Sequence, residues 1–183
     1  MIFTCTVDTP LGAMTASAED DALTGLWFMG QKYYPETLGW TDKPEYPPFA
    51  GLRAWLEIYF AGKPPPPVKG PLPACCASSG SGAGALRLLR LNPRGTDFQK
   101  AVWEQLLAIP YGKSGAYGEI AKKIAVRRGL PSMSAQAVGG AVGHNPISIL
   151  IPCHRVLGVG GSLTGYAGGL DKKKALLGLE GCF

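Results

Sequence analysis

Residues 145–156 read Asn-Pro-Ile-Ser-Ile-Leu-Ile-Pro-Cys-His-Arg-Val, and the rest of the chain can be interpreted outward from this stretch. The apolar, partly β-branched run at residues 147–151 is typical of a buried strand. Pro152 cannot continue a strand, so the predicted strand ends there and presents Cys153 from a rigid support. A thiol becomes a good nucleophile at neutral pH when a base or a positive charge lies beside it, and His154 and Arg155 follow directly.

A structural interpretation of Cys153 competes with this chemical one. A lone cysteine after an apolar run is usually a small core residue. Here, however, a titratable base and a fixed cation follow the cysteine in a chain that has only two histidines. The combination favours a reactive cysteine.

The residues before this stretch predict a mostly helical region. Thr96 and Asp97 form a candidate N-cap, and an apolar stripe follows until Pro110. Residues 117–126, a Gly-Leu-Pro turn at 129–131 and residues 134–142 then predict a helix-turn-helix. The second of these helices consists mostly of small residues, which allow close approach either to DNA or to a neighbouring helix. Helix packing is the commoner of the two explanations.

The first half of the chain predicts a small sheet with one helix. Short β-rich runs at residues 2–7, 14–17 and 23–28 are separated by turn signals, and residues 52–60 have helical apolar spacing. Residues 63–85 hold four consecutive prolines, Cys75, Cys76 and a Ser/Gly/Ala tract, which we interpret as a mobile loop. Residues 86–91 can return to the sheet as a strand.

These segments together predict an α+β protein with two domains. Residues 1–93 form a small N-terminal α/β roll of antiparallel sheet plus helix, and residues 94–183 form a mostly helical C-terminal domain with the helix-turn-helix. The N-terminal half carries seven Lys or Arg against eight Asp or Glu, whereas the second half carries eleven against five. A basic second half suits a polyanion such as nucleic acid, although lysine is also the ordinary residue of a solvated helix face.

Composition also narrows the cellular setting. The chain has 183 residues and no run of about 18 apolar residues, and its first residues lack the pattern of a secretory signal. We therefore expect a cytoplasmic protein without a membrane partner. Five irregularly spaced cysteines do not predict a disulfide framework, and no cluster of cysteines and histidines predicts a zinc site. We expect neither a metal nor another cofactor.

The motif at residues 151–156, Ile-Pro-Cys-His-Arg-Val, resembles the active-site signature of the O6-alkylguanine-DNA alkyltransferases. The resemblance extends to Tyr-Gly-Glu-Ile-Ala at residues 117–121 and Ala-Val-Gly-Gly-Ala at 137–141. It continues through Gly-Tyr-Ala-Gly-Gly-Leu at 165–170 and Leu-Leu-Gly-Leu-Glu at 176–180. It covers roughly residues 96–180 and is specific there, while residues before 93 match only in general pattern.

The resemblance implies a mechanism in which the protein acts once. Cys153 takes the alkyl group from O6-alkylguanine in double-stranded DNA, and O4-alkylthymine is left open as a second substrate. Glu180 orients His154, which draws the thiol proton through a water molecule, and Tyr117 donates a proton to the leaving oxygen. The product is a thioether that water does not cleave at a useful rate, so each molecule is inactivated by its own reaction.

The resemblance also implies how the DNA is held. The second helix of the helix-turn-helix enters the minor groove and the damaged nucleotide is flipped out of the duplex. Asn145 ties this helix to the active-site strand. The residues expected at the DNA and the base are Gln136, Ala137, Asn145, Arg155, Val156, Tyr166, Ala167 and Gly168. We expect the protein to act as a monomer.

Gln136 is a departure from the family pattern, because many members have an arginine there that fills the gap left by the flipped base. Glutamine can still form hydrogen bonds with the orphaned partner base, but it carries no charge and stacks less well. We therefore expect weaker extrusion of the damaged base, or a different dependence on the base opposite to it.

Two other functions remain as alternatives. A non-catalytic damage binder would share the scaffold, but such proteins lack the cysteine, and Cys153, Glu180 and Tyr117 argue against it. A cysteine hydrolase or transamidase would need an oxyanion site and an acyl-binding cleft, which the sequence does not indicate.

Overall fold

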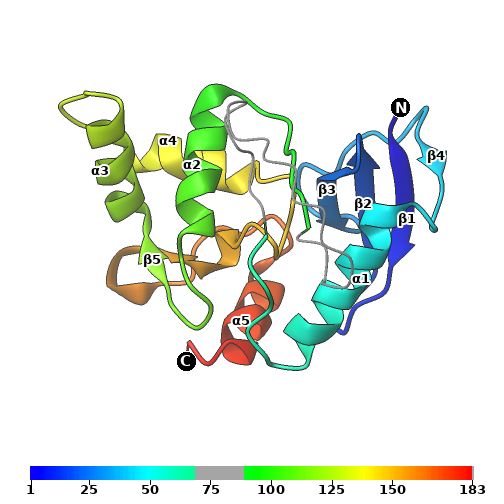
Figure 1. Cartoon of the computed structure of the whole chain (residues 1–183). Coiled ribbons are helices and arrows are strands. Elements are labelled where there is room, and N and C mark those ends of the chain that lie inside the picture. The colour runs from blue at the N-terminus through cyan, green and yellow to red at the C-terminus, as the bar shows by residue number, and fades with distance from the viewer. Residues whose placement is uncertain (69–88, 183) are drawn as a thin grey trace.

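The computed structural model describes residues 1–68 and 89–182. A small sheet with one helix against it lies on one side of the molecule, and the remaining helices lie on the other side (Figure 1). This arrangement confirms the predicted α+β class, with a mixed sheet in the N-terminal part and a helical C-terminal part. The division into two domains at residue 93 stays a prediction.

The sheet has the strand order β3-β2-β1-β4. Strands β1 (Phe3–Val7), β2 (Met14–Glu19) and β3 (Ala22–Phe28) form an antiparallel meander, and the short β4 (Thr41–Asp42) pairs in parallel with β1. Every residue of β3 is buried, which indicates that both of its faces are covered.

Helix α1 (Pro47–Phe60) packs against this sheet and begins five residues before the predicted helix. Pro47 and Pro48 at its start also suit a connection between elements, so the sequence gives no helical signal there. Proline is nevertheless well accommodated in the first turn of a helix, because the N–H groups there have no partner within the helix. The buried side of α1 includes Phe49, Leu52, Trp55 and Tyr59, so its last turns face the centre of the molecule.

The outer edge of β3 is completed by two segments that are distant in the sequence. Leu23 forms a parallel bridge with Leu91, and Leu26 forms one with Ile147. The Leu26 N–H donates to Pro146 O at 2.8 Å, and the Ser148 N–H donates to Leu26 O at 2.8 Å. The sheet therefore holds the residues just before Cys153 in place.

The C-terminal part contains α2 (Asp97–Leu107), α3 (Tyr117–Arg127), α4 (Ala135–Gly143) and α5 (Leu170–Leu179). Thr96 caps α2 as predicted and forms a reciprocal capping box with Gln99. Helices α3 and α4 match the predicted helix-turn-helix to within a residue or so, and Ser134 caps α4. Short strands β5 (Gly115–Ala116) and β6 (Val156–Leu157) pair in parallel.

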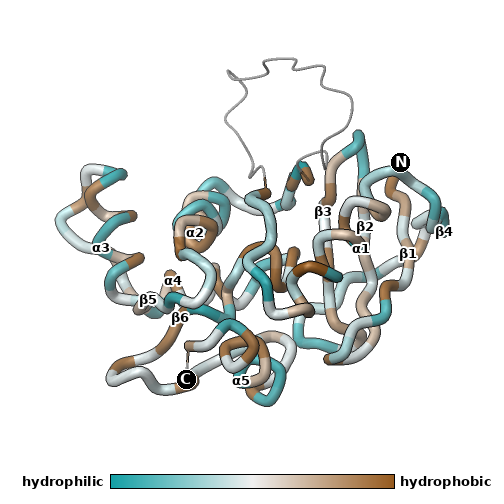
Figure 2. Tube along the Cα trace, turned by 60° about the horizontal axis from the view of Figure 1, so that its bottom comes forward, coloured by the Kyte–Doolittle hydropathy of each residue, from teal (hydrophilic) through white to brown (hydrophobic). Residues whose placement is uncertain are grey.

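One continuous hydrophobic core joins the two parts, and brown apolar segments gather in the middle of the molecule (Figure 2). Most of the predicted loop at residues 63–85, including Cys75 and Cys76, lies outside the described residues, as does the first half of the predicted strand at 86–91, whose Leu91 bridges to β3. Within residues 1–68 and 89–182, no helix is both long and apolar enough to cross a membrane.

Candidate active site

The residues before Cys153 form a tight irregular turn, so the prediction of a buried strand at residues 147–151 is wrong. Ile147 forms only an isolated bridge with β3, and the side chain of Asn145 supplies further hydrogen bonds to the turn. Its Nδ2 donates to Ile151 O at 2.8 Å and to Ile147 O at 3.2 Å, and its Oδ1 accepts from the Ile147 N–H at 3.0 Å. Ile149 adopts a left-handed conformation with φ of 70°, which is rare for a β-branched residue. The run is buried as expected, but the asparagine shapes it into a loop.

Cys153 begins the 3-10 turn η1 (Cys153–Arg155) and is buried. Asn145 Nδ2 lies 3.1 Å from Cys153 Sγ as a hydrogen-bond donor. Burial raises the pKa of the thiol, while this hydrogen bond and the positive charge of Lys173 lower it. Because burial is the largest of these effects, the cysteine needs a base to take its proton.

Lys173 is a functional candidate that the sequence analysis missed. Its side chain is fully buried in α5, and Nζ donates to Val156 O at 2.6 Å and to Thr164 O at 2.7 Å. Burial lowers the pKa of this lysine to about 8, and the nearby Cys153 opposes that shift. The cation that acts on the thiol is therefore Lys173, whereas we had expected Arg155. Three consecutive lysines at 172–174 contain no signal that marks the middle one as buried.

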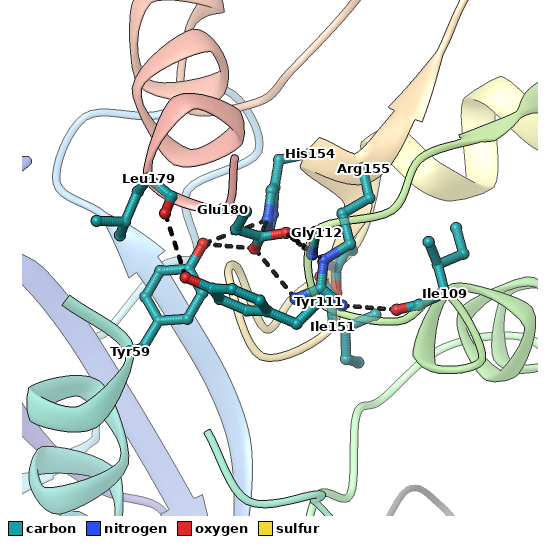
Figure 3. Close-up of polar contacts among 10 residues, drawn as sticks. Tyr59, Ile109, Tyr111, Gly112, Ile151, His154, Arg155, Leu179 and Glu180 are labelled. Carbon is teal, nitrogen blue, oxygen red and sulfur yellow. Dashed lines mark hydrogen bonds and ion pairs between the residues drawn. The ribbon is translucent and has the colours of Figure 1, made fainter. Parts of the chain in front are cut away.

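His154 and Glu180 form a fully buried pair (Figure 3). His154 Nε2 and Glu180 Oε1 lie 2.8 Å apart. Because the carboxylate can only accept, the imidazole carries its proton on Nε2 and leaves the Nδ1 lone pair free. Within the described part of the chain, Nδ1 is buried and has no hydrogen-bond partner. This nitrogen is thus available as a base on the side away from Glu180.

Arg155 binds Glu180 from a second direction. Its Nε donates to Oε2 at 2.8 Å, its Nη2 donates to Oε1 at 3.0 Å, and its Nη1 donates to Ile109 O at 2.6 Å. We had expected Arg155 at the DNA, but its guanidinium is buried and committed to these acceptors. The expectation is corrected for a physical reason. Adjacent residues in a motif can point in different directions, and the Arg155 side chain points to the buried carboxylate of Glu180.

Glu180 follows α5 and receives further hydrogen bonds from the Tyr59 hydroxyl at 2.7 Å and the Gly112 N–H at 3.4 Å. Burial alone would raise the pKa of its carboxyl, but the donors and charges of His154 and Arg155 outweigh that effect and hold the pKa at about 2. Glu180 is therefore ionised at any physiological pH.

Tyr117 is the first residue of α3, and the pairing of β5 with β6 brings its backbone beside the residues that follow η1. Its side chain lines a groove of about 960 Å³ together with Gln136, Gly139, Leu157 and Thr164. Burial raises the pKa of the Tyr117 hydroxyl, a hydrogen bond with Thr164 lowers it, and the charge of Cys153 raises it. The hydroxyl is thus neutral, and it is close enough to Cys153 to be affected by its charge.

Two family models match the chain. The 6-O-methylguanine DNA methyltransferase DNA-binding domain matches residues 97–182, and the ribonuclease-like domain of the same proteins matches residues 2–72. The chain belongs to the 6-O-methylguanine DNA methyltransferase family. It carries out DNA repair by transferring an alkyl group to a cysteine of the protein itself.

Relatives and solved structures of this family match over nearly the whole chain. A methylated-DNA–protein-cysteine methyltransferase of Mycolicibacterium paratuberculosis is 43% identical over 96% of this chain and 90% of its own length. One from Methanosarcina acetivorans is 40% identical over 95% of each chain. A crystal structure of Mycobacterium tuberculosis OGT in complex with DNA superposes with a TM-score of 0.75 at 39% identity, over 98% of this chain and 92% of that one.

In this methyltransferase, the outer face of α4 is exposed and the inner face is packed. Val138, Ala141 and Val142 are buried, and Trp103 Nε1 donates to Ala141 O at 2.9 Å. Gln136 and Ala137 are exposed, and Gln136 lines the groove beside Tyr117. Small residues on this helix thus serve packing on one side and leave an open face on the other.

Residues 166–168, the pocket loop that we expect at the flipped base, are attached to the turn that follows β3. The Lys32 N–H donates to Ala167 O at 3.0 Å. A Cβ at Gly168 would lie 2.8 Å from the Tyr166 ring and 2.9 Å from the Phe28 ring, so a side chain at position 168 would displace one of them. The Tyr166 ring lies edge-on to His154 at 6.5 Å. The absence of a side chain at Gly168 therefore leaves the space that the Tyr166 ring occupies.

In the described part of this methyltransferase, no group of three or more His, Cys, Asp or Glu residues is arranged to hold a metal ion. The Glu180 carboxylate is paired with the His154 imidazole and with the Arg155 guanidinium.

Proposed function

We propose that Cys153 is the residue that receives the alkyl group, in a single displacement on O6-alkylguanine in double-stranded DNA. The thiolate attacks the sp³ carbon on O6, a carbon–sulfur bond forms, and the carbon–oxygen bond breaks with its electron pair going to the guanine oxygen. Tyr117 supplies a proton to that oxygen. The observation that carries the proposal is the buried His154–Glu180 pair beside a buried cysteine.

The proposed base is Nδ1 of His154, acting on the Cys153 thiol through a water molecule. Glu180 stabilises the imidazolium that results, because its oxygen already accepts the hydrogen bond from Nε2. Asn145 and Lys173 stabilise the sulfur anion through a hydrogen bond and a positive charge. Since the product is a thioether, the reaction occurs once per molecule and needs no cofactor.

The DNA-binding surface that we propose is the exposed face of α4. Gln136 and Ala137 enter the minor groove, and the flipped base is held by main-chain groups at Cys153 and Val156 and by the loop at residues 166–168. Asn145 acts indirectly, by shaping the active-site turn. Residues 94–183 form the DNA-binding and transfer domain and residues 1–93 its support, and the protein acts as a monomer in the cytoplasm.

Mass spectrometry of the intact protein and of its peptides tests the proposal. After incubation with duplex DNA containing O6-methylguanine, we expect one added methyl group, located on Cys153, and at most one methyl per protein molecule. A parallel incubation with O4-methylthymine DNA tests the second substrate. DNA binding without any mass change would instead identify a damage binder, and repeated turnover would identify a hydrolase-type enzyme.

Replacing Gln136 with arginine is expected to raise both DNA affinity and repair rate. Arginine adds a charge and a planar group to an exposed position on α4, and we expect an increase of about 3- to 10-fold in the repair rate. The rate of methyl loss from DNA and the binding constant at fixed salt provide the measurement. Ser132→Arg is the matched control, because it adds the same charge to an exposed turn outside the groove lining. If Gln136→Arg changes neither quantity, the interpretation of Gln136 is wrong.

A further inference from the structure

Tyr59 reaches the active site from the N-terminal part of the chain. It belongs to the last turns of α1 and is fully buried. Its hydroxyl donates to Glu180 Oε1 at 2.7 Å and lies 3.4 Å from His154 Nε2 (Figure 3). These partners are 121 and 95 residues away in the sequence.

Aromatic neighbours hold the Tyr59 ring in one orientation. It stacks on Trp55 at 5.4 Å with an interplanar angle of 10°, and it meets Phe60 at 5.3 Å and Tyr111 at 6.0 Å edge to face. Since α1 itself is packed on the sheet, the position of the hydroxyl is set by the sheet and by this cluster. Tyr59 is therefore rigid in the way that a positioning group has to be.

The direction of the hydrogen bonds follows from the chemistry of the three groups. Burial and the negative charge of Glu180 raise the pKa of Tyr59, so the phenol stays neutral and has one proton. It donates that proton to Glu180, which can only accept. The phenol oxygen then has only lone pairs to offer to His154 Nε2. Both oxygens that face Nε2 thus favour a proton on that nitrogen and leave Nδ1 as the base.

We propose that Tyr59 is a positioning residue for alkyl transfer, whose hydroxyl shares Oε1 of Glu180 with His154 and so completes the general-base pair from the N-terminal part of the chain. This inference rests on the proposed function. It assigns to the sheet and α1 a contribution to the chemistry in addition to their role as support.

Sharing an acceptor oxygen has a consequence for the basicity of His154. The charge of Oε1 is spread over three donors, Tyr59, His154 and Arg155, so it stabilises the imidazolium less than it would without the phenol hydroxyl. Burial lowers the pKa of His154, Glu180 raises it, and Arg155 and Lys173 lower it.

Titratable and charged groups face His154 from several elements. They are Tyr59 from α1, Cys153 and Arg155 from η1, Tyr166 from the pocket loop, and Lys173 and Glu180 from α5 and its end.

Removing the Tyr59 hydroxyl should raise the pKa of His154, because the 2.7 Å hydrogen bond that competes for Oε1 outweighs the longer 3.4 Å contact with Nε2. A general base must be neutral to accept a proton, so the loss of rate should be greatest on the acidic side and should shrink as the pH rises. In Tyr59→Phe we expect the acid limb of the pH–rate profile to move to higher pH, with a rate about 10-fold below wild type on that limb. A loss of packing would instead lower the rate equally at every pH.

Two measurements on the full-length protein test this inference. The first is the single-turnover rate of methyl transfer from O6-methylguanine DNA between about pH 5.5 and 9. The second is ¹⁵N NMR of the two histidines, with the exposed His144 as internal reference. Tyr46→Phe is the matched control, since it removes an α1-associated phenol hydroxyl that accepts from the Asp21 N–H outside the site. It should leave both the rate profile and the His154 titration unchanged.

A fluorinated tyrosine at position 59 provides a second variant with the opposite sign. Fluorine makes the phenol a stronger donor, so the His154 titration and the acid limb should move to lower pH, and this variant retains the ring if Tyr59→Phe fails to fold. The inference is overturned if the His154 titration is the same in wild type and in the Tyr59 variants. Failure of the wild-type protein to methylate Cys153 would instead refute the proposed function, so the two failures are distinguishable.

Discussion

Replacing Cys153 with serine is expected to abolish methyl transfer while leaving the fold and DNA binding in place. A serine hydroxyl is far less acidic than a thiol, and the base available to it is a histidine whose pKa burial lowers. We expect the single-turnover rate to fall by at least about 1,000-fold. The Oγ of serine can still accept the hydrogen bond from Asn145 Nδ2, so the active-site turn should persist. The rate is measured with O6-methylguanine DNA, and thermal unfolding checks the fold.

Cys182→Ser is the control for this substitution. Cys182 is partly exposed near the end of the chain, and burial raises the pKa of its thiol without any hydrogen-bonded base beside it in the described structure. This variant should transfer methyl groups like the wild type. Cys75 and Cys76, which lie outside the described residues, are followed in the same peptide map. Methyl transfer at the wild-type rate by Cys153→Ser, or a methyl group on another cysteine, would contradict the assignment of Cys153.

Replacing Glu180 with glutamine is expected to reduce both the transfer rate and the stability. The amide is neutral, so the buried guanidinium of Arg155 loses its counter-charge and His154 loses the group that stabilises its protonated form. Breaking a buried ion pair by removing one partner costs about 3–5 kcal/mol in the free energy of unfolding. We expect the transfer rate to fall by about 100-fold or more. Urea unfolding and single-turnover kinetics provide the two measurements.

The pH dependence of stability gives a separate check on Glu180. Its folded-state pKa of about 2 lies below the ordinary carboxyl value. The carboxylate therefore contributes its full stabilisation above the unfolded pKa of about 4.3, and that contribution is lost as the pH falls toward 2. The stability difference between wild type and Glu180→Gln should shrink over this window.

Glu104→Gln is the matched control for the Glu180 variant. It also breaks a carboxylate–guanidinium pair, but the pair of Glu104 with Arg127 lies at the surface. Surface ion pairs contribute roughly 0–1 kcal/mol, so we expect little change in stability and none in the transfer rate. Equal losses in the two variants would show that Glu180 has no special role.

Local signals explain which parts of the fold were predictable. The capping box at Thr96, the apolar stripe of α2 and the turn between α3 and α4 depend on residues a few positions apart. The start of α1 was missed because Pro47 and Pro48 suit both a connection and a first helical turn. The segment at 147–151 was misinterpreted because its burial is visible in the sequence, whereas the side-chain hydrogen bonds of Asn145 that bend it are not.

The candidate cysteine, the histidine next to it, the helix-turn-helix and the family all follow from the sequence alone, because they depend on residue type and short spacing. Which groups meet at His154 depends instead on how distant segments pack together. Arg155 turns inward to Glu180, Lys173 is buried beside Cys153, and Tyr59 arrives from the other half of the chain. These contacts come from segments that pack at the centre of one core, and the burial that shifts the pKa values of Tyr59 and Lys173 exists only once that core is formed.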